Sequence, residues 1–244
     1  MDKDCKEEIL TEPTEKTLKR FTSLAVAIDM LVRRRLTLLN PAKWDDQNDV
    51  AFLEAYRKQR EIPKVFAMCF TQAPETFHHW SVFAGGLEGI RINIDKLALL
   101  SSLRTNPCYA WNDVMYRTLD KMASITAISV YDIPFLKRYA FRDELEFRLL
   151  YECVDPKAMF HHVPIELEWI QSVTVSPWMP ENLFESAKVT IRKIEGCEKL
   201  SIKRTTLREN NRWKRATRRI VPEDAAQNPL PRNPINLDIS LDSL

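Results

Sequence analysis

The stretch FRDELEFRLLYE, residues 141–152, places Glu144, Glu146 and Arg148 at alternate positions. On an extended chain these three side chains share one face, and the apolar residues between them share the other. Two carboxylates beside a guanidinium can stabilise developing positive charge and accept a proton. They can equally form an ion-pair ladder on a solvated strand, which contributes roughly 0.2–1 kcal/mol per cross-strand pair. Taken alone, this stretch favours the ladder.

Two further stretches place polar side chains on apolar strands. LKRFTS has Arg20 and Thr22 on one face of a strand that runs into a helix, and FAMCFTQ ends an apolar strand with Thr71 and Gln72. Polar residues at the ends of buried strands are typical of ligand sites, because the strand fixes them while the edge leaves them accessible. Together with the two glutamates they form an ordered set: a cation, a hydroxyl and a carboxylate pair.

The elements that position these groups follow from hydrophobic periodicity and turn residues. Strands are expected at 18–23, 36–39, 64–72, 88–95, 124–132, 170–177 and 199–207, and helices at 24–36, 49–61, 74–84, 96–122 with a break near Pro107, 133–141 and 180–195. Several strands follow one another through long connections. The sequence therefore predicts an α+β fold, with a mixed or antiparallel β-sheet core flanked by short helices.

Composition excludes several classes of protein. The chain has 244 residues and four glycines, and it contains neither GxGxxG nor GxxxxGK[ST], which argues against a dinucleotide-binding Rossmann unit and a P-loop kinase. It has no apolar run near the ~20 residues of a membrane helix, and the charged start lacks the apolar core of a signal peptide. We expect a cytoplasmic protein with no membrane partner.

A metal centre is not expected. The five cysteines are scattered without a CxxC pair. The four histidines form two adjacent pairs, 78–79 and 161–162, whose members point apart on a helix or a strand.

Four regions are predicted along the chain. They are a charged N-terminal arm (1–15), one domain (16–210), a basic segment (211–221) and a proline-rich tail expected to be disordered (222–244).

The order of arginine, hydroxyl and glutamate resembles that of the ADP-ribosyltransferase-like superfamily, in the branch with arginine, serine and glutamate on successive strands. Over roughly residues 16–210 the chain also resembles a bacterial family, domain of unknown function 2971. That resemblance is carried by RFTSLAVAIDMLVRRRLTLLNPAKWDD, FAMCFTQAPETFHHWSVFAGGLEGIRINID and KRYAFRDELEFRLLY. The last is the most specific, with Lys137 and Phe141 ahead of Glu-x-Glu-x-Arg. An ADP-ribosyltransferase-like fold is implied.

The resemblance also implies NAD as the substrate, with no metal. Glu146 would stabilise the ribose cation that forms as nicotinamide leaves, and Glu144 would position or deprotonate the acceptor. Arg20 would hold the NAD diphosphate, and Thr71 would orient the ribose or the nicotinamide amide. Arg148 is expected to be a structural partner of the carboxylates.

Three more residues are candidates for contact with NAD. Thr22 shares a strand face with Arg20. Trp80 is at the border of the expected pocket, although a tryptophan on a short helix is more often part of a core. Tyr139 could close over nicotinamide.

The segment 203–219 carries eight Lys or Arg against the single acid Glu209. Such a block attracts nucleic-acid phosphates or an acidic protein, or is a solvated tail. The candidate nucleic-acid contacts are Arg212, Trp213, Lys214, Arg215, Arg218 and Arg219, with Trp213 available to stack on a base. An antitoxin or other partner subunit could bind the same segment.

The sequence leads to one main hypothesis and two alternatives. The main one is an NAD-dependent, toxin-like ADP-ribosyltransferase, implied to act in bacterial antiphage defence, that modifies nucleic acid or protein. The first alternative is a non-catalytic nucleic-acid-binding or sensor module of the same fold. The second is an NAD glycohydrolase, in which water replaces the acceptor.

Overall fold

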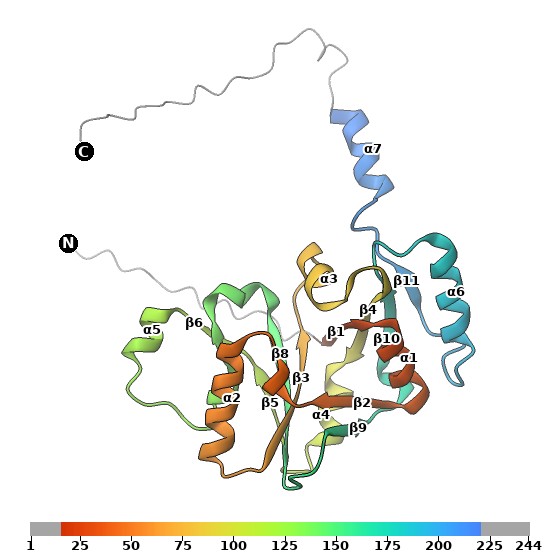
Figure 1. The fold of residues 1–244 in the computed structure, drawn as a ribbon. Coiled ribbons are helices and arrows are strands. Elements are labelled where there is room, and N and C mark those ends of the chain that lie inside the picture. Colours follow the sequence, from red (N-terminus) through yellow and green to blue (C-terminus); the bar gives the residue numbers. More distant parts are fainter. Residues whose placement is uncertain (1–15, 221–244) are drawn as a thin grey trace, which may run out of the picture. The chain divides into compact units, whose positions relative to one another are not determined.

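The computed structural model describes residues 16–220 (Figure 1). The predicted arm, 1–15, and the predicted tail, 222–244, lie outside these residues. The chain divides into two compact units, Met1–Leu207 and Arg208–Leu244, which are described separately below.

The first unit is built on a nine-stranded sheet in the order β11-β10-β4-β1-β3-β2-β9, with β8 pairing to both β3 and β5. Its pairs are antiparallel except β10 with β11. The strands are β1 (Thr17–Ser23), β2 (Arg35–Leu39), β3 (Lys64–Thr71), β4 (Gly89–Asp95), β5 (Tyr109–Asp113), β8 (Glu146–Cys153), β9 (Phe160–Pro164), β10 (Ile170–Val175) and β11 (Ile202–Arg204). A small parallel sheet joins β6 (Met115–Arg117) to β7 (Leu136–Arg138). The predicted α+β class with a mixed, mostly antiparallel sheet is confirmed.

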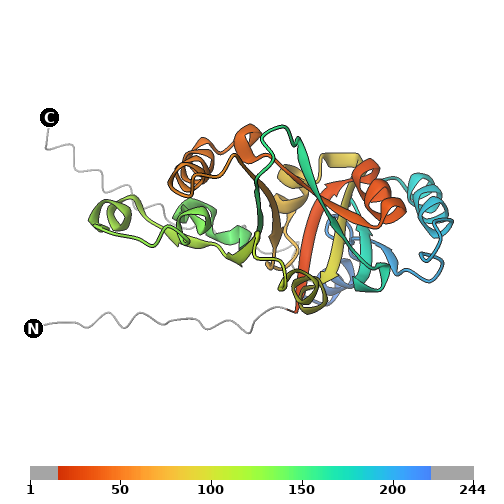
Figure 2. The same cartoon turned by 90° about the horizontal axis from the view of Figure 1, so that it is seen from below.

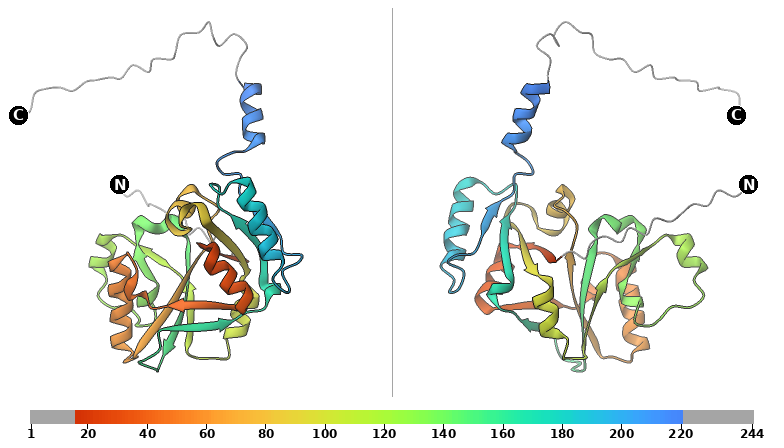
Figure 3. Two further views of the ribbon diagram at one scale, coloured as in Figure 1. Left: turned by 45° about the vertical axis from the view of Figure 1, so that its right-hand side comes forward. Right: turned by 180° about the vertical axis from the view of Figure 1, so that it is seen from behind.

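Short helices flank the sheet, as predicted. Ser23 caps α1 by accepting a hydrogen bond from the Val26 amide, and Thr76 caps α3 in the same way from His79. Views from two sides show α2 beside β3 and β8, and α6 on the other side of the unit, near β10 (Figure 3). The helices are α1 (Leu24–Arg33), α2 (Gln47–Gln59), α3 (Phe77–Phe83), α4 (Lys96–Leu103), α5 (Leu119–Ser124) and α6 (Glu181–Arg192), with 3₁₀ turns η1 (Pro41–Lys43), η2 (Gly86–Glu88), η3 (Ile133–Phe135), η4 (Tyr139–Glu144) and η5 (Leu167–Trp169).

Alternation along the strands gives the sheet two different faces. Leu18 of β1 lies opposite Ile94 of β4, and both belong to the largest core, as do Phe70 and Phe147. Figure 2 shows β1 and β4 running side by side. The other face carries two smaller cores, one beneath α2 and one beside α3, which consist of Leu53, Tyr56, Ile62, Val65, Ala67, Phe135 and Leu150, and of Phe21, Trp80 and Ala84. Charged side chains occupy the same face as these two smaller cores.

Three of the predicted elements are wrong. The helix expected at 96–122 ends at Leu103, because the chain returns as β5, which pairs with β8 and packs Tyr109 against Tyr151. Residues 125–132 form no strand within the described chain, although their apolar pattern alternates, because no neighbouring strand pairs with them. The expected helix at 133–141 is instead η3, β7 and part of η4.

One strand is missing from the prediction, and one boundary differs from it. The strand β9, which pairs with β2, is absent from the predicted elements, because a histidine pair and a proline interrupt its apolar pattern. Alternation predicts that Glu144 lies on the same strand as Glu146. Strand β8 begins only at Glu146, however, and Glu144 lies in η4. Leu145 joins the two with a left-handed backbone, φ 39°.

None of the helices in residues 16–220 has the length and apolarity that a membrane span requires.

In the second unit, the described residues form α7 (Asn211–Ile220). The Asn210 carboxamide caps it, accepting from the amides of Arg212 and Trp213 at 2.9 and 3.1 Å. Helical spacing places Trp213 and Ile220 on one side, where they are 78% and 68% exposed. Arg212, Lys214, Arg215 and Arg219 lie at other positions of the helix.

Candidate active site

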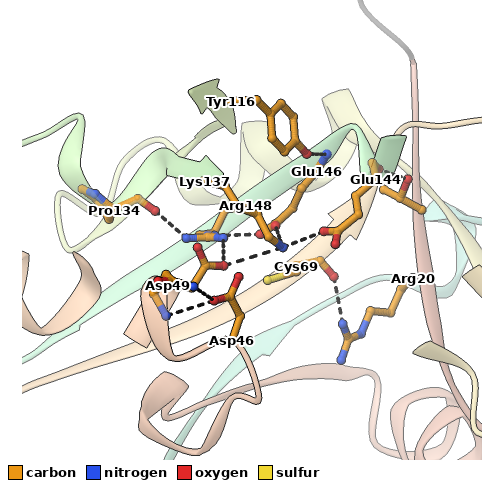
Figure 4. Close-up of polar contacts among 12 residues, drawn as sticks. Arg20, Asp46, Asp49, Cys69, Tyr116, Pro134, Lys137, Glu144, Glu146 and Arg148 are labelled. Carbon is orange, nitrogen blue, oxygen red and sulfur yellow. Dashed lines mark hydrogen bonds and ion pairs between the residues drawn. The ribbon is translucent and has the colours of Figure 1, made fainter. Parts of the chain in front are cut away.

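A cluster of five charged side chains lies on the sheet face described above, between the two smaller cores. We call it the charged cluster; it consists of Asp49, Lys137, Glu144, Glu146 and Arg148. The Lys137 ammonium lies 2.6 Å from Glu144 Oε2, 3.0 Å from Glu146 Oε2 and 3.6 Å from Asp49 Oδ2. Arg148 donates through Nε to Glu146 Oε1 at 2.7 Å and through Nη2 to Asp49 Oδ2 at 2.8 Å. Figure 4 shows these contacts.

Backbone geometry brings Glu144 and Glu146 together with Thr71. Thr71 ends β3 and lies directly opposite Glu146 in β8. The Thr71 hydroxyl donates to the Glu144 carbonyl and accepts from the Ala73 amide at 3.0 Å. The Glu146 amide donates to the Tyr116 hydroxyl at 2.9 Å. The three residues therefore lie together where the end of β3 adjoins the start of β8, with the Thr71 hydroxyl bound to the backbone rather than to a carboxylate.

Glu146 is an ionised carboxylate. Burial alone would raise the pKa of its carboxyl, but the Arg148 guanidinium and the Lys137 ammonium lower that pKa to about 2. The side chain is 3% exposed, and each of its oxygens accepts from a cation. Position 146 therefore carries a fixed negative charge, and two cations of the protein contact it.

Glu144 and Asp49 behave in the opposite way. Burial raises the pKa of the Glu144 carboxyl, and Lys137 only partly opposes this shift. Burial likewise raises the pKa of Asp49 against the effect of Arg148. Three acids face two cations here, so proton uptake by Glu144 or Asp49 relieves the excess negative charge.

Arg148 holds the cluster in place. It is fully buried, donates to the Pro134 carbonyl at 2.7 Å and lies 5.2 Å from the centre of the Trp44 ring. These contacts agree with the structural role expected for Arg148. Because Arg148 donates to both Glu146 and Asp49, the same contacts hold the Glu146 carboxylate in place.

Arg20 and Thr22 lie on the sheet face of the largest core. In β1 they lie opposite Ile92 and Ile90 of β4, whereas the register places Lys19 beside Thr71. The Arg20 guanidinium reaches between the strands and donates to the Cys69 carbonyl at 2.9 Å (Figure 4). Burial lowers the pKa of Arg20, and the Glu146 charge opposes that shift, so the two residues interact across β3.

Trp80 and Tyr139 are in different environments. Trp80 is fully buried beside Phe21, and its indole N–H donates to Glu75 at 2.6 Å. Tyr139 is 48% exposed, with the Arg142 guanidinium 4.5 Å from its ring centre. Trp80 is thus a core residue, and contact of either side chain with NAD stays a prediction.

Register places five polar residues in line across five strands. We call this line the polar row; it consists of Glu146, Thr71, Lys19, Asn93 and Ser172. Directly opposite residues in antiparallel strands point to the same side of the sheet. The charged cluster is therefore continuous with a polar strip that crosses β3, β1, β4 and β10.

Asp49, Lys19 and Asn93 are not among the site residues that the sequence predicts. The sequence indicates Asp49 only as a residue near a helix start, but it is 3% exposed and binds Arg148. Lys19 and Asn93 alternate with core residues on their strands. This alternation indicates that Lys19 and Asn93 lie on the face opposite the core. The sequence does not show which face of the sheet holds the site.

Metal binding has no support among residues 16–220, where no group of three or more His, Cys, Asp or Glu side chains could hold an ion. The six candidate nucleic-acid contacts all lie on α7, in the second unit.

Comparisons with known proteins find similarity at the level of solved structures alone. No family model matches the chain, and no curated protein matches it. Membership of the domain of unknown function 2971 family therefore stays a prediction. Thermus sp. 2.9 DarT in complex with carba-NAD+ is 11% identical with a TM-score of 0.41, covering 80% of this chain and 97% of that chain. The same protein in complex with ADP-ribosylated ssDNA is 12% identical with a TM-score of 0.43, covering 80% and 96%. At TM-scores of this size the likeness assigns neither an activity nor a ligand to this chain.

Proposed function

We propose that this chain is an NAD-dependent ADP-ribosyltransferase with a toxin-like activity. One observation supports this most: two carboxylates that share the Lys137 ammonium have pKa values shifted in opposite directions, Glu146 down to about 2 and Glu144 up. Paired acids with separated pKa values are typical of sites in which one carboxylate stays charged and the other exchanges a proton.

The chemistry fits these two roles. The bond between the ribose C1′ and the nicotinamide nitrogen breaks, and its electron pair leaves with nicotinamide, so positive charge develops on the ribose. The fixed anion of Glu146 stabilises that charge more in the transition state than in the ground state. A nucleophilic atom of the acceptor then bonds to C1′, and Glu144, whose raised pKa suits a base, takes the proton that this atom releases.

Lys137 has to move for this reaction. Its ammonium now donates to the carboxylates of both Glu144 and Glu146, so a ribose cation between these carboxylates would take its place. A chain of four methylenes carries this ammonium, and the Phe141 ring lies 5.0 Å from it. In our proposal, substrate binding displaces the ammonium and leaves Arg148 to hold Glu146.

The acceptor is proposed to be a nucleic acid, with protein as the other possibility. The cations of α7 neutralise phosphates without regard to base sequence, and the exposed Trp213 offers a surface on which a base can stack. A role in antiphage defence, a cytoplasmic location and control by an antitoxin follow from the resemblance and belong to the same proposal.

A second candidate function is favoured by a specific observation. Glu146 is 3% exposed and both its oxygens are paired, as in a purely structural ion cluster. A non-catalytic nucleic-acid-binding module would keep this cluster for stability and use α7 for binding. An NAD glycohydrolase would use the same carboxylates with water as the acceptor.

Labelled NAD separates these functions. The parent chain is incubated with NAD carrying a labelled adenylate and, in separate reactions, with total RNA, DNA and protein from cells. Label on one of these classes supports the transferase, and NAD loss without labelling indicates the glycohydrolase. Nucleic-acid binding with no NAD turnover would favour the module and overturn the proposal. The double variant Glu146→Gln/Lys137→Met is the matched negative control, because it removes one anion and one cation together.

A further inference from the structure

Three polar atoms on the face of the charged cluster are buried without a hydrogen-bond partner among the described residues. They are Nε2 of His79, Nε of Arg91 and Oδ1 of Asn93. Buried polar groups in proteins are almost always paired, since an unpaired one loses its hydration without compensation. Three such atoms on one face therefore indicate a place where the protein meets a polar ligand.

These atoms lie close together by register. Arg91 and Asn93 are alternate residues of β4 on the same face, opposite Phe21 and Lys19 of β1. The His79 ring stacks on Phe21 at 5.4 Å between centres, with 21° between planes. We call Lys19, His79, Arg91 and Asn93 the anion patch.

Two of these residues are cationic, and each has partners of its own. Arg91 donates to the Thr174 hydroxyl at 3.1 Å and lies 3.6 Å from Glu75, whose other oxygen accepts from Trp80. The Lys19 ammonium donates to the Gln72 carbonyl at 2.9 Å.

Positive charges also lie near His79. Burial lowers the pKa of His79, and the charges of Lys19 and Arg91 lower it further, together with His78. Among the described residues, Asp143 is the acid that opposes this shift. His79 itself is 1% exposed, and its Nδ1 is 2.8 Å from the Thr76 hydroxyl. Its other nitrogen is the one that lacks a hydrogen bond within the described part of the chain.

We propose that the anion patch binds the phosphate groups of a ribose-phosphate ligand, namely the diphosphate of NAD, next to Glu146. The N–H groups of Arg91 and His79 and the Lys19 ammonium would donate to phosphate oxygens. The Asn93 oxygen accepts, so it suits a ribose hydroxyl. This proposal rests on the proposed function. It differs from the expectation drawn from the sequence, because Lys19 and Arg91 take the place of Arg20 as the diphosphate contacts.

Spacing along the polar row fits such a ligand. Glu146, Thr71 and Lys19 lie on three adjacent strands, so roughly 10 Å of sheet separates the first from the last. The proposal places the 5′-phosphate of a ribose beside Glu146 toward Lys19 and β4. The side chain of Arg91 is 14% exposed, so solvent reaches part of it.

Binding of ADP-ribose, which cannot react, tests the patch by calorimetric titration. Arg91→Met and His79→Phe are each expected to weaken binding roughly tenfold or more. The first variant loses a charge-assisted hydrogen bond to phosphate, and the second loses a buried donor. Arg33→Met, which removes an exposed arginine of α1, is the matched control and should bind as the parent does. His79→Phe keeps the stacking on Phe21 but also removes the contact of Nδ1 with the Thr76 hydroxyl, so a small fall in melting temperature is expected and the affinity for ADP-ribose is the deciding measurement.

The outcomes separate this proposal from the proposed function. Unchanged affinity in both variants, or no binding of ADP-ribose and of inorganic pyrophosphate by the parent, overturns the anion patch, whether or not NAD is consumed. Binding that depends on Arg91 and His79 without any NAD turnover supports the patch and overturns the transferase. A His79→Phe variant that melts lower and binds ADP-ribose normally identifies a structural histidine and contradicts the proposal. Weaker binding of single-stranded oligonucleotide with unchanged ADP-ribose would instead assign the patch to the acceptor, which also overturns it.

Discussion

Lys137 and Glu146 form an ion pair of 3.0 Å in which the side chains are 9% and 3% exposed. The carboxylate proposed to face the ribose cation thus already holds a cation of the protein. Such a pair is costly to break from one side alone, because the remaining charge stays buried. This relationship governs how substitutions at the site should be interpreted.

Removing the charge of Glu146 should affect stability as well as activity. Glu146→Gln leaves Arg148 and Lys137 with one anion fewer, which should cost about 3–5 kcal/mol of unfolding free energy. The double variant Glu146→Gln/Lys137→Met should recover much of that loss yet transfer no ADP-ribose. Urea unfolding and labelled-NAD assays measure the two effects. A double variant that is folded and as active as the parent would exclude Glu146 from catalysis.

The stability of the protein should change with pH in two opposing ways. The Glu146 pKa of about 2 lies below the ordinary 4.5, so its stabilisation is complete above about pH 4.5 and is lost as the pH falls toward 2. Glu144 has a raised pKa, so its ionisation destabilises the fold as the pH rises above 4.5. Glu144→Gln should therefore lose little stability at pH 8, unlike Glu146→Gln. A loss as large at pH 8 as that of Glu146→Gln would contradict this assignment.

The contribution of Thr71 to the stability of the fold should depend on its hydroxyl. Its Oγ1 links the Glu144 carbonyl to the Ala73 amide in a buried position, so Thr71→Val leaves two backbone groups unpaired and should cost about 1–3 kcal/mol. Thr71→Ser keeps the hydroxyl and should cost less. Chemical denaturation of the two variants gives the difference. Equal stability of Val and Ser at this position would show that the hydroxyl does not link the strands.

The sequence identifies Thr71 at the end of one apolar strand and Glu146 on another. Register places the two residues directly opposite each other, and alternation alone does not show which strands adjoin. The sequence also places Glu144 beside Glu146. Glu144 reaches this position from outside the strand, because the left-handed backbone of Leu145 turns the chain before β8. Alternation cannot predict such a turn, since it depends on one backbone angle.

Tertiary contacts decide the remaining features. Asp49 is a helix residue whose importance comes from Arg148, 99 positions away along the chain. Residues 109–113 form a strand because β8 pairs with them, and their own pattern does not predict it. Arg20 is predicted to hold the NAD diphosphate, and register places it on the sheet face of the largest core, which its own strand pattern does not show.

The cations of α7 should govern nucleic-acid binding through salt dependence. Replacing Arg212, Lys214, Arg215 and Arg219 with Gln should weaken binding to single-stranded DNA of any sequence. The slope of log affinity against log salt should fall by about 0.7 for each phosphate that is no longer neutralised. Trp213→Ala should weaken binding with the slope unchanged, because stacking releases no ions. Fluorescence anisotropy at several salt concentrations measures both. An unchanged slope in the charge variant would show that α7 does not bind the backbone.

Strands β1 and β3 meet at the single register pair Lys19–Thr71 among the described residues, and one position further along β1, Arg20 gives its guanidinium to the Cys69 carbonyl. Between these two strands, therefore, side-chain bonds supplement a very short backbone ladder. A seam of this kind separates more easily than the eight-pair ladder of β3 and β8. Amide hydrogen exchange should accordingly be faster along the β1 edge of β3 than along its β8 edge, and the two halves of the sheet should open there before β3 and β8 separate.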